Sequence, residues 1–313
     1  MGETFTTFLP LIVNTSTPKR MDLGAQVWPG TLYPSATVDR ANRWLVPGAK
    51  VLIPVWWDDI ETSPGAYDWT GIKLIMDALT EYDVILSVKN APIEYRTIPE
   101  IESSEPTEEG KLAYVVLLQE MASRFSVWGF ELWNEPDTKR IIEIAMSKFI
   151  GAWGNTFEDG QGYGEFVELC CANLPDNIKI LAGALGWPDQ SEFIHGFLDV
   201  SSSFDYLSYH KYIHADWGEG EPFWKYEELS NWISSLTNKP LYVTETSYLY
   251  TTASEENEQR QADFLRYILH EIPYSMIMGV LWYTLYGNGW QNSDLDEKEV
   301  KTVWMEALTN YEI

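Results

Sequence analysis

The sequence predicts an α/β protein, a single-domain (β/α)8 TIM barrel, and three observations carry this prediction. Eight short apolar segments recur between residues 23 and 285, and amphipathic helical patterns separate them. The apolar segments do not alternate polar and apolar residues, which is typical of parallel strands covered on both faces. No low-complexity linker divides the 313 residues. A doubly wound open sheet is the alternative architecture.

The expected strands follow one another along the whole chain. Val, Ile, Leu, Tyr and Trp dominate them, as the β-propensity of branched and aromatic residues requires. In chain order they are LGAQVW (23–28), KVLIPVW (50–56), DVILSVK (83–89), VWGFELW (127–133), IKILAGAL (178–185), FDYLSYH (204–210), PLYVTET (240–246) and GVLWYTL (279–285).

Helical patterns occupy the segments between these strands. In residues 108–125, apolar side chains recur on one helical face. The segment 254–272 opens with Ser254 as an N-cap and has two glutamates in its first turn. We expect residues 21–313 to form the barrel. Residues 1–20 are expected to be an N-terminal extension, either the remnant of an export segment or a strand at the barrel floor.

The composition narrows the choice of partners. The formal net charge is −26 and the sequence pI is about 4.4, which argues against nucleic acid, anionic membranes and polyanionic substrates. No apolar run reaches the roughly 18 residues of a membrane span. The 15 Trp and 18 Tyr residues are many, and flat aromatic faces suit sugar rings as well as core packing. Cys170 and Cys171 are expected to be free thiols, because adjacent side chains diverge on a helix.

The catalytic residues of such barrels lie at the C-terminal ends of the strands. Two carboxylates fall there, Glu135 after the fourth strand and Glu245 at the seventh. Two facing carboxylates are the minimum for glycoside hydrolysis, in which one acts as an acid and the other as nucleophile or base. A circle of eight strands can bring these ends opposite each other. The other residues at strand ends are Trp57, Asp58, Lys89, Asn90, Asn134, Tyr209, His210 and Trp282.

Five strand-end motifs, in the expected order, resemble the glycoside hydrolases of clan A. FELWNEPD (130–137) resembles the acid/base motif of the clan, with Asn-Glu-Pro after barrel strand four. LYVTETS (241–247) resembles strand seven, which carries the nucleophile, and YLSYHKY (206–212) resembles strand six. VWWDDIETSPGAYDWTGI (55–72) resembles the strand-two loop of families 39 and 5, and Trp282 matches the strand-eight tryptophan.

This resemblance implies a retaining β-glycosidase that works by double displacement. Glu135 would be the general acid/base and Glu245 the nucleophile. Asn134 would hydrogen-bond the 2-hydroxyl group of the substrate, an interaction that strengthens in the transition state. His210 would contact the substrate or the acid/base glutamate.

The resemblance also assigns roles to aromatic residues. Tyr212 or Tyr209 would hold Glu245 in place and help to keep it ionised, and Trp282 would lie under the sugar at the cleavage site. Further aromatic residues in loops at the same end of the barrel are candidate sugar platforms: Trp57, Trp187, Trp217, Trp224, Tyr286 and Trp290.

One departure from the clan concerns the positive charge near the nucleophile. Many members carry an arginine on or near strand two, and KVLIPVWW (50–57) has none. Lys89 at the end of strand three is a candidate for that charge, although lysine and arginine differ in geometry. The segment VKNAP (88–92), which includes Asn90, also differs from the usual strand-three histidine of family 5.

The expected substrate is a neutral β-linked oligo- or polysaccharide of the gluco, xylo or manno type, cleaved without a cofactor or metal. Two alternatives stay open: a carbohydrate-binding barrel that has lost catalysis, and a transglycosylase that uses the same two glutamates. The only partner expected is the carbohydrate, with no nucleic acid and no membrane. We expect a monomer that acts outside the cell, with a cytoplasmic location as the alternative.

Overall fold

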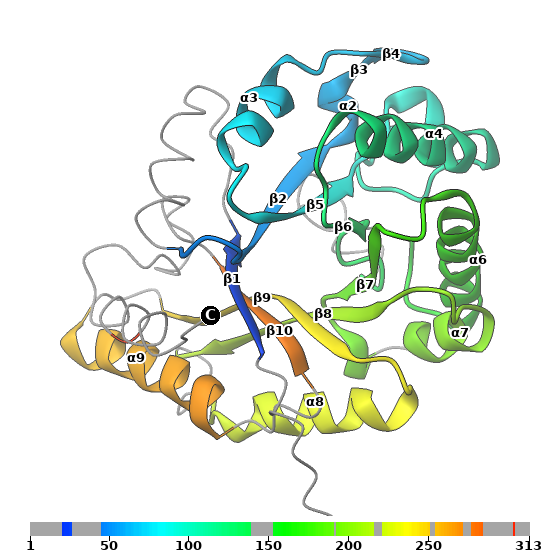
Figure 1. The fold of residues 1–313 in the computed structure, drawn as a ribbon. Helices are drawn as coiled ribbons and strands as arrows, with labels where there is room; N and C mark the ends of the chain where they lie inside the picture. Colours follow the sequence, from blue (N-terminus) through cyan, green and yellow to red (C-terminus); the bar gives the residue numbers. More distant parts are fainter. Residues whose placement is uncertain are drawn as a thin grey trace, which may run out of the picture.

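The protein is described by a computed structural model. Eight parallel strands form a closed barrel, in which each strand pairs with two neighbours and the first strand pairs with both the second and the last (Figure 1). The predicted TIM barrel is therefore confirmed. The structure describes residues 21–26, 45–138, 153–190, 192–215, 221–250, 254–271, 277–283 and 303.

The barrel strands coincide closely with the predicted segments. Strands β8 and β9 continue beyond their predicted ends, so that His210 and Glu245 lie within strands and are paired with each other across the β8–β9 ladder. The eight strands are β1 (Asp22–Gln26), β2 (Lys50–Trp56), β5 (Asp83–Lys89), β6 (Gly129–Leu132), β7 (Lys179–Leu185), β8 (Tyr206–His214), β9 (Leu241–Leu249) and β10 (Ile277–Trp282).

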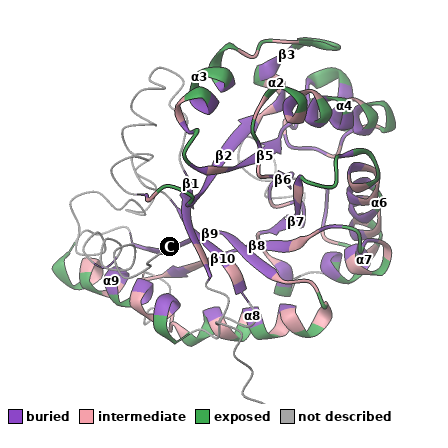
Figure 2. Cartoon of the chain, viewed as in Figure 1, coloured by how far each residue is buried: buried purple, intermediate pink, exposed green. Residues whose placement is uncertain are grey.

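Both faces of the barrel strands are buried, which explains the absence of alternation in the sequence (Figure 2). A small cluster of apolar residues from five strands fills the barrel interior, and a much larger core lies between the strands and the surrounding helices. The interior cluster consists of Leu52, Ile85, Leu181, Tyr242 and Leu281.

The outer layer consists of helices with exposed outward faces (Figure 2). Three of them begin with a side-chain cap: Thr107, Thr156 and Ser254 each accept a hydrogen bond from a backbone N–H of the first turn. None of the described helices is long and apolar enough to cross a membrane. The six longer helices are α3 (Thr70–Ala78), α4 (Glu108–Arg124), α6 (Phe157–Asn173), α7 (Phe193–Val200), α8 (Trp224–Leu236) and α9 (Glu255–His270). Cys170 and Cys171 on α6 are free thiols, as predicted.

The segment after β2 forms a short helix and a two-stranded antiparallel hairpin, and some of its side chains pack into the core. It consists of the short helix α2 (Trp57–Ile60) and strands β3 (Glu61–Ser63) and β4 (Ala66–Tyr67). The indole N–H of Trp57 donates to the buried carboxylate of Glu61, and its ring stacks on Tyr95 with centroids 5.3 Å apart. The prediction of Trp57 as a sugar platform is therefore wrong, because its ring is fully buried in the outer core.

Helices α6 and α7 pack closely because glycine lies at their contact. A Cβ atom on Gly196 would stand 1.8 Å from the carbonyl oxygen of Phe157, far inside van der Waals contact. The backbones of the two helices can approach this closely only while residue 196 has no side chain.

We expect Gly196→Ala to lower the free energy of unfolding by about 1–3 kcal/mol, because one helix must shift away from the other. Denaturant unfolding measures this change. Gly71→Ala is the matched control: Gly71 is also helical, but no atom would lie within 4 Å of its Cβ. Alanine at that exposed position should stabilise the protein by about 0.5–1 kcal/mol. Equal effects of the two substitutions would contradict the close helix contact.

Candidate active site

Four side chains from β8, β9 and the segment after β6 meet at the C-terminal end of the barrel. Glu135 follows β6, His210 and Tyr212 belong to β8, and Glu245 belongs to β9. The backbone that presents Glu135 is unusual, because Trp133 and Glu135 both have positive φ angles, of 71° and 47°. Such angles are uncommon outside glycine, and they cluster at functional sites.

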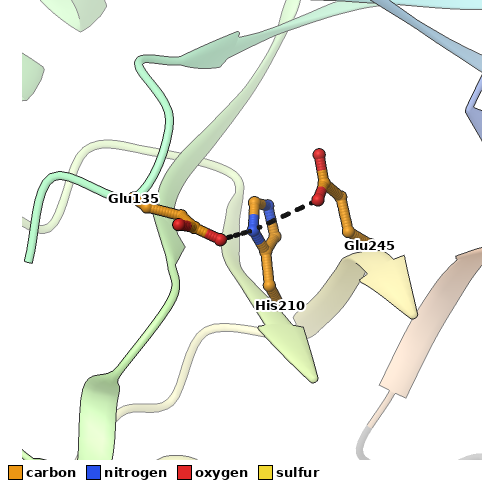
Figure 3. Close-up of side chains that lie close together, drawn as sticks. All are labelled: Glu135, His210 and Glu245. Atoms are coloured by element: carbon orange, nitrogen blue, oxygen red, sulfur yellow. Dashed lines mark hydrogen bonds and ion pairs between the residues drawn. The ribbon is translucent and has the colours of Figure 1, made fainter. Parts of the chain in front are cut away.

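His210 lies between the two glutamates (Figure 3). Its Nδ1 atom is 2.8 Å from Oε1 of Glu135 and 3.6 Å from Oε2 of Glu245. The phenol of Tyr212 donates a hydrogen bond of 2.5 Å to the same Oε2 atom of Glu245. One oxygen of each glutamate and a ring nitrogen of His210 all lie within 4.8 Å of one another. The two carboxylates therefore face each other across a narrow gap.

Several buried ionisable side chains lie close together around the two glutamates. Burial alone would lower the pKa of His210, but the negative charges of Glu245 and Glu135 outweigh burial and raise it to about 9. Lys89 at the end of β5 is also buried, and burial lowers its pKa although Glu245, Glu135 and Glu131 oppose the shift. Lys89 thus lies close enough to Glu245 to interact with its charge, in a barrel whose second strand carries no arginine.

Glu131 carries a buried carboxyl group beneath the site. The sequence motifs assigned no role to this residue. It is fully inaccessible, and burial raises its pKa while the positive charge of His210 opposes the shift. A signal was present in the sequence, because Glu131 is the one charged residue within the apolar segment 127–133. Its partners come from other strands, so the sequence did not identify them.

The raised pKa of His210 predicts how stability depends on pH. The folded-state pKa of about 9 lies above the ordinary value of 6.5, so the protonated histidine stabilises the fold fully below pH 6.5. That contribution is lost as the pH rises through about 9. We expect the wild type to lose about 2–3 kcal/mol more unfolding free energy than His210→Gln between pH 6.5 and 9.5. Denaturant unfolding at several pH values measures this, and parallel curves for the two proteins would contradict it.

Tyr209 and Trp282 do not lie where the sequence placed them. The phenol of Tyr209 hydrogen-bonds to Ser230 of α8 at 2.7 Å, so its ring is buried on the helix side of the barrel. Trp282 is also fully buried, and its ring packs against Phe264 of α9. The alternative that Tyr209 holds Glu245 is therefore wrong, and so is the placement of Trp282 under the sugar, because side chains alternate along a strand and these two point outward.

Tyr283 directly follows β10, the eighth strand of the barrel, and it is the aromatic residue of that segment that lies near the site. Leu281 belongs to the cluster in the barrel interior, so residue 283 returns to the same side as residue 281. The ring of Tyr283 meets the ring of Tyr212 edge to face, with centroids 5.7 Å apart. Its backbone N–H donates to the carbonyl of Thr246 next to Glu245. The alternation of β10 was the signal that could have identified Tyr283.

The other predicted site residues lie in different surroundings. Asn134 and Asn90 are buried at strand ends of the same face, and Asn90 has a φ of 60°. Trp187 is half-buried in the loop after β7, and Trp224 is exposed at the start of α8. Trp133, which ends the predicted fourth strand, is buried among outer-core aromatics. Trp217, Tyr286 and Trp290 lie outside the described residues.

Glu135, His210 and Glu245 are also the one group in the described part of the chain with the spacing of a metal site. Oε1 of Glu135 and Nδ1 of His210 are hydrogen-bonded to each other, and Oε2 of Glu245 accepts a hydrogen bond from Tyr212. Two acids bridged by a histidine are a complete acid–base arrangement in themselves.

Comparisons with known proteins show the same fold. No family model and no curated protein matches the sequence. Among solved structures, a family 39 glycoside hydrolase from Bacteroides cellulosilyticus WH2 is similar with a TM-score of 0.62 and 20% identity, covering 93% of this chain and 64% of that one. A glucosidase from Croceicoccus marinus has a TM-score of 0.65 and 13% identity, over 93% and 68%. An exo-β-1,4-mannosidase from Opitutaceae bacterium strain TAV5 has a TM-score of 0.65 and 16% identity, over 93% and 59%.

These likenesses establish that the chain shares the barrel fold of these three structures. The chain spans 64% of the length of the family 39 structure. The family 39 protein therefore contains further sequence beyond the shared barrel.

Proposed function

We propose that this protein is a retaining β-glycoside hydrolase that cleaves a neutral β-linked saccharide of the gluco, xylo or manno type. The observation that carries the proposal is the pair of carboxylates from Glu135 and Glu245, with oxygens within 4.8 Å of each other at the C-terminal end of the barrel. Retaining glycosidases hold their two carboxyl groups about 5–5.5 Å apart, whereas inverting enzymes leave about 6.5–9.5 Å for a water.

In this proposal Glu245 is the nucleophile. The hydrogen bond from Tyr212 fixes Oε2, which leaves the second carboxylate oxygen available to attack the anomeric carbon. Lys89 and His210 both interact electrostatically with Glu245, and attack by Glu245 requires its carboxylate form. The buried position of Glu245 keeps it away from bulk solvent.

Glu135 is the general acid/base. Its side chain is somewhat more exposed than that of Glu245, with 16% against 10% of its surface accessible. This suits a group that must first protonate the leaving oxygen and then activate a water molecule. His210 occupies Oε1 of Glu135, so Oε2 would carry the proton toward the leaving group. Asn134, the preceding residue, is proposed to bind the 2-hydroxyl group of the sugar.

Two other functions use the same site. A barrel that binds carbohydrate without cleaving it is favoured by one observation, the absence of an arginine in residues 50–57. A transglycosylase would use the same glutamates and would pass the sugar to an acceptor in place of water. We also propose that the protein acts as a monomer outside the cell in polysaccharide degradation.

The test uses purified protein with polysaccharides and with 4-nitrophenyl β-glycosides of glucose, xylose and mannose. Release of nitrophenol is expected for at least one sugar, and proton NMR of the first product should show the β-anomer. An α-anomer would indicate inversion and overturn the retaining mechanism. Binding without release of nitrophenol or reducing sugar would favour the binding-only barrel. Transfer products at high sugar concentration would favour the transglycosylase.

A further inference from the structure

Asp137 is a buried carboxylate that lies close to the site and has no part in the chemistry described above. Only 1% of its surface is accessible. Its two oxygens accept one backbone hydrogen bond each, from Gly186 at 2.9 Å and from Trp187 at 2.8 Å. Burial raises its pKa to about 7, although the two N–H groups favour the charged form. Asp137 therefore fastens the loop after β7 to the loop after β6, at the cost of burying a carboxylate.

The loop that Asp137 holds lies directly against Glu135. A Cβ atom on Gly186 would stand 2.8 Å from Cδ of Glu135 and 3.1 Å from Oε1, so the glycine backbone is in contact with the carboxyl group. The backbone N–H of Glu135 donates to the carbonyl of Ala184 near the end of β7, at 2.9 Å. Gly186 and His210 thus both limit where the Glu135 carboxyl can lie.

We propose that Asp137 is a positioning residue, which holds Gly186 against Glu135 and so keeps the carboxyl of Glu135 where it can protonate the leaving group. The same pair of hydrogen bonds fixes Trp187 in the loop on the acid/base side of the cleft. This inference rests on the proposed function, because it assigns a role within the same reaction.

The role has a kinetic signature, because the two chemical steps need Glu135 differently. Formation of the glycosyl-enzyme needs its proton only when the leaving group is basic. Breakdown of the glycosyl-enzyme always needs it as a base. A displaced Glu135 should therefore slow the first step for phenyl glycosides and spare that step for dinitrophenyl glycosides.

The experiment compares phenyl and 2,4-dinitrophenyl β-glycosides of a sugar that the wild type hydrolyses. Asp137→Asn keeps the shape of the side chain but removes the charge and one of the two acceptor oxygens. We expect kcat/KM for the phenyl glycoside to fall by about 10–100-fold, a part of the 10²–10⁴-fold that acid catalysis supplies. For the dinitrophenyl glycoside, kcat/KM should stay within about 3-fold while kcat and KM fall together.

Gly186→Ala tests the same inference without touching Asp137. Its new methyl group would press on the Glu135 carboxyl, so the same split between the two substrates is expected. This second variant decides the question if Asp137→Asn does not fold. Asp205→Asn is the matched control, because Asp205 also accepts a backbone hydrogen bond from β7, at Ile180 near the opposite end of that strand. It should leave both kcat/KM values within about 3-fold of the wild type.

A uniform loss with both substrates, or no loss, in Asp137→Asn and Gly186→Ala would overturn the positioning role. That outcome leaves the glycosidase proposal intact, because the wild type would still hydrolyse both substrates. A wild type that releases neither phenol from any aryl glycoside nor reducing sugar from any polysaccharide would instead remove the proposed function and this inference with it.

Discussion

Glu245→Ala is expected to abolish hydrolysis of every glycoside, with kcat/KM falling by at least about 10⁴-fold. The reason is that no covalent intermediate can form without the carboxylate, however good the leaving group is. Tyr212 and His210 both contact Oε2 of Glu245, and neither of them carries a carboxylate that could take over the attack. The measurement is release of 2,4-dinitrophenol from the β-glycoside selected by the substrate screen, together with denaturant unfolding to show that the variant is folded.

Tyr212→Phe is the matched control for this loss. It removes the O–H that donates to Oε2 of Glu245 and keeps the aromatic ring that meets Tyr283. We expect an intermediate loss of about 10–100-fold in kcat/KM, because a single hydrogen bond to a charged group is lost. Full activity of Glu245→Ala, or a greater loss in Tyr212→Phe than in Glu245→Ala, would remove Glu245 from the role of nucleophile.

The strands of the barrel could be predicted from the sequence because their physical signal is local. A strand covered on both faces is a continuous apolar run, and eight such runs separated by helices leave few alternative folds. The meeting of the two carboxylates was also predictable, because the C-terminal ends of the strands lie together at one end of a closed barrel.

The direction in which each aromatic residue points was not predictable in the same way. Tyr209 and Trp282 each precede a residue that lies at or near the site, namely His210 and Tyr283, so an error of one position exchanges the two faces. The ladders between β8 and β9 and between β9 and β10 both carry register irregularities at these positions. Such bulges change which side chain faces inward, and they depend on the neighbouring strand.

Buried carboxylates were missed for a related reason. Asp137 is compensated by backbone N–H groups some fifty positions further along the chain, and Glu131 is placed beside His210 of β8. Only the folded barrel brings these partners together. A sequence can show that a carboxylate lies in an apolar or strand-end position, but it does not show what makes its burial tolerable.

Glu135→Ala is expected to give a different phenotype from Glu245→Ala, and the difference separates the two roles. A dinitrophenyl leaving group needs little proton donation, so the glycosyl-enzyme on Glu245 should still form. Its breakdown lacks the base, so turnover should slow by about 10²–10⁴-fold and the intermediate should accumulate, with a burst of dinitrophenol followed by a slow steady rate. Mass spectrometry of the intact protein should show the added sugar.

Sodium azide provides the decisive measurement on Glu135→Ala. Azide is a charged nucleophile that needs no deprotonation, and the truncated side chain leaves room for it beside His210. Added azide should therefore restore turnover of the dinitrophenyl glycoside and yield a β-glycosyl azide, because two displacements retain the configuration. Azide with Glu245→Ala serves as the control, since a single displacement there would give the α-glycosyl azide. If azide rescues only Glu245→Ala and the product is the β-anomer, the two glutamates have exchanged roles; if Glu135→Ala keeps full activity without azide, the acid/base lies elsewhere in the barrel.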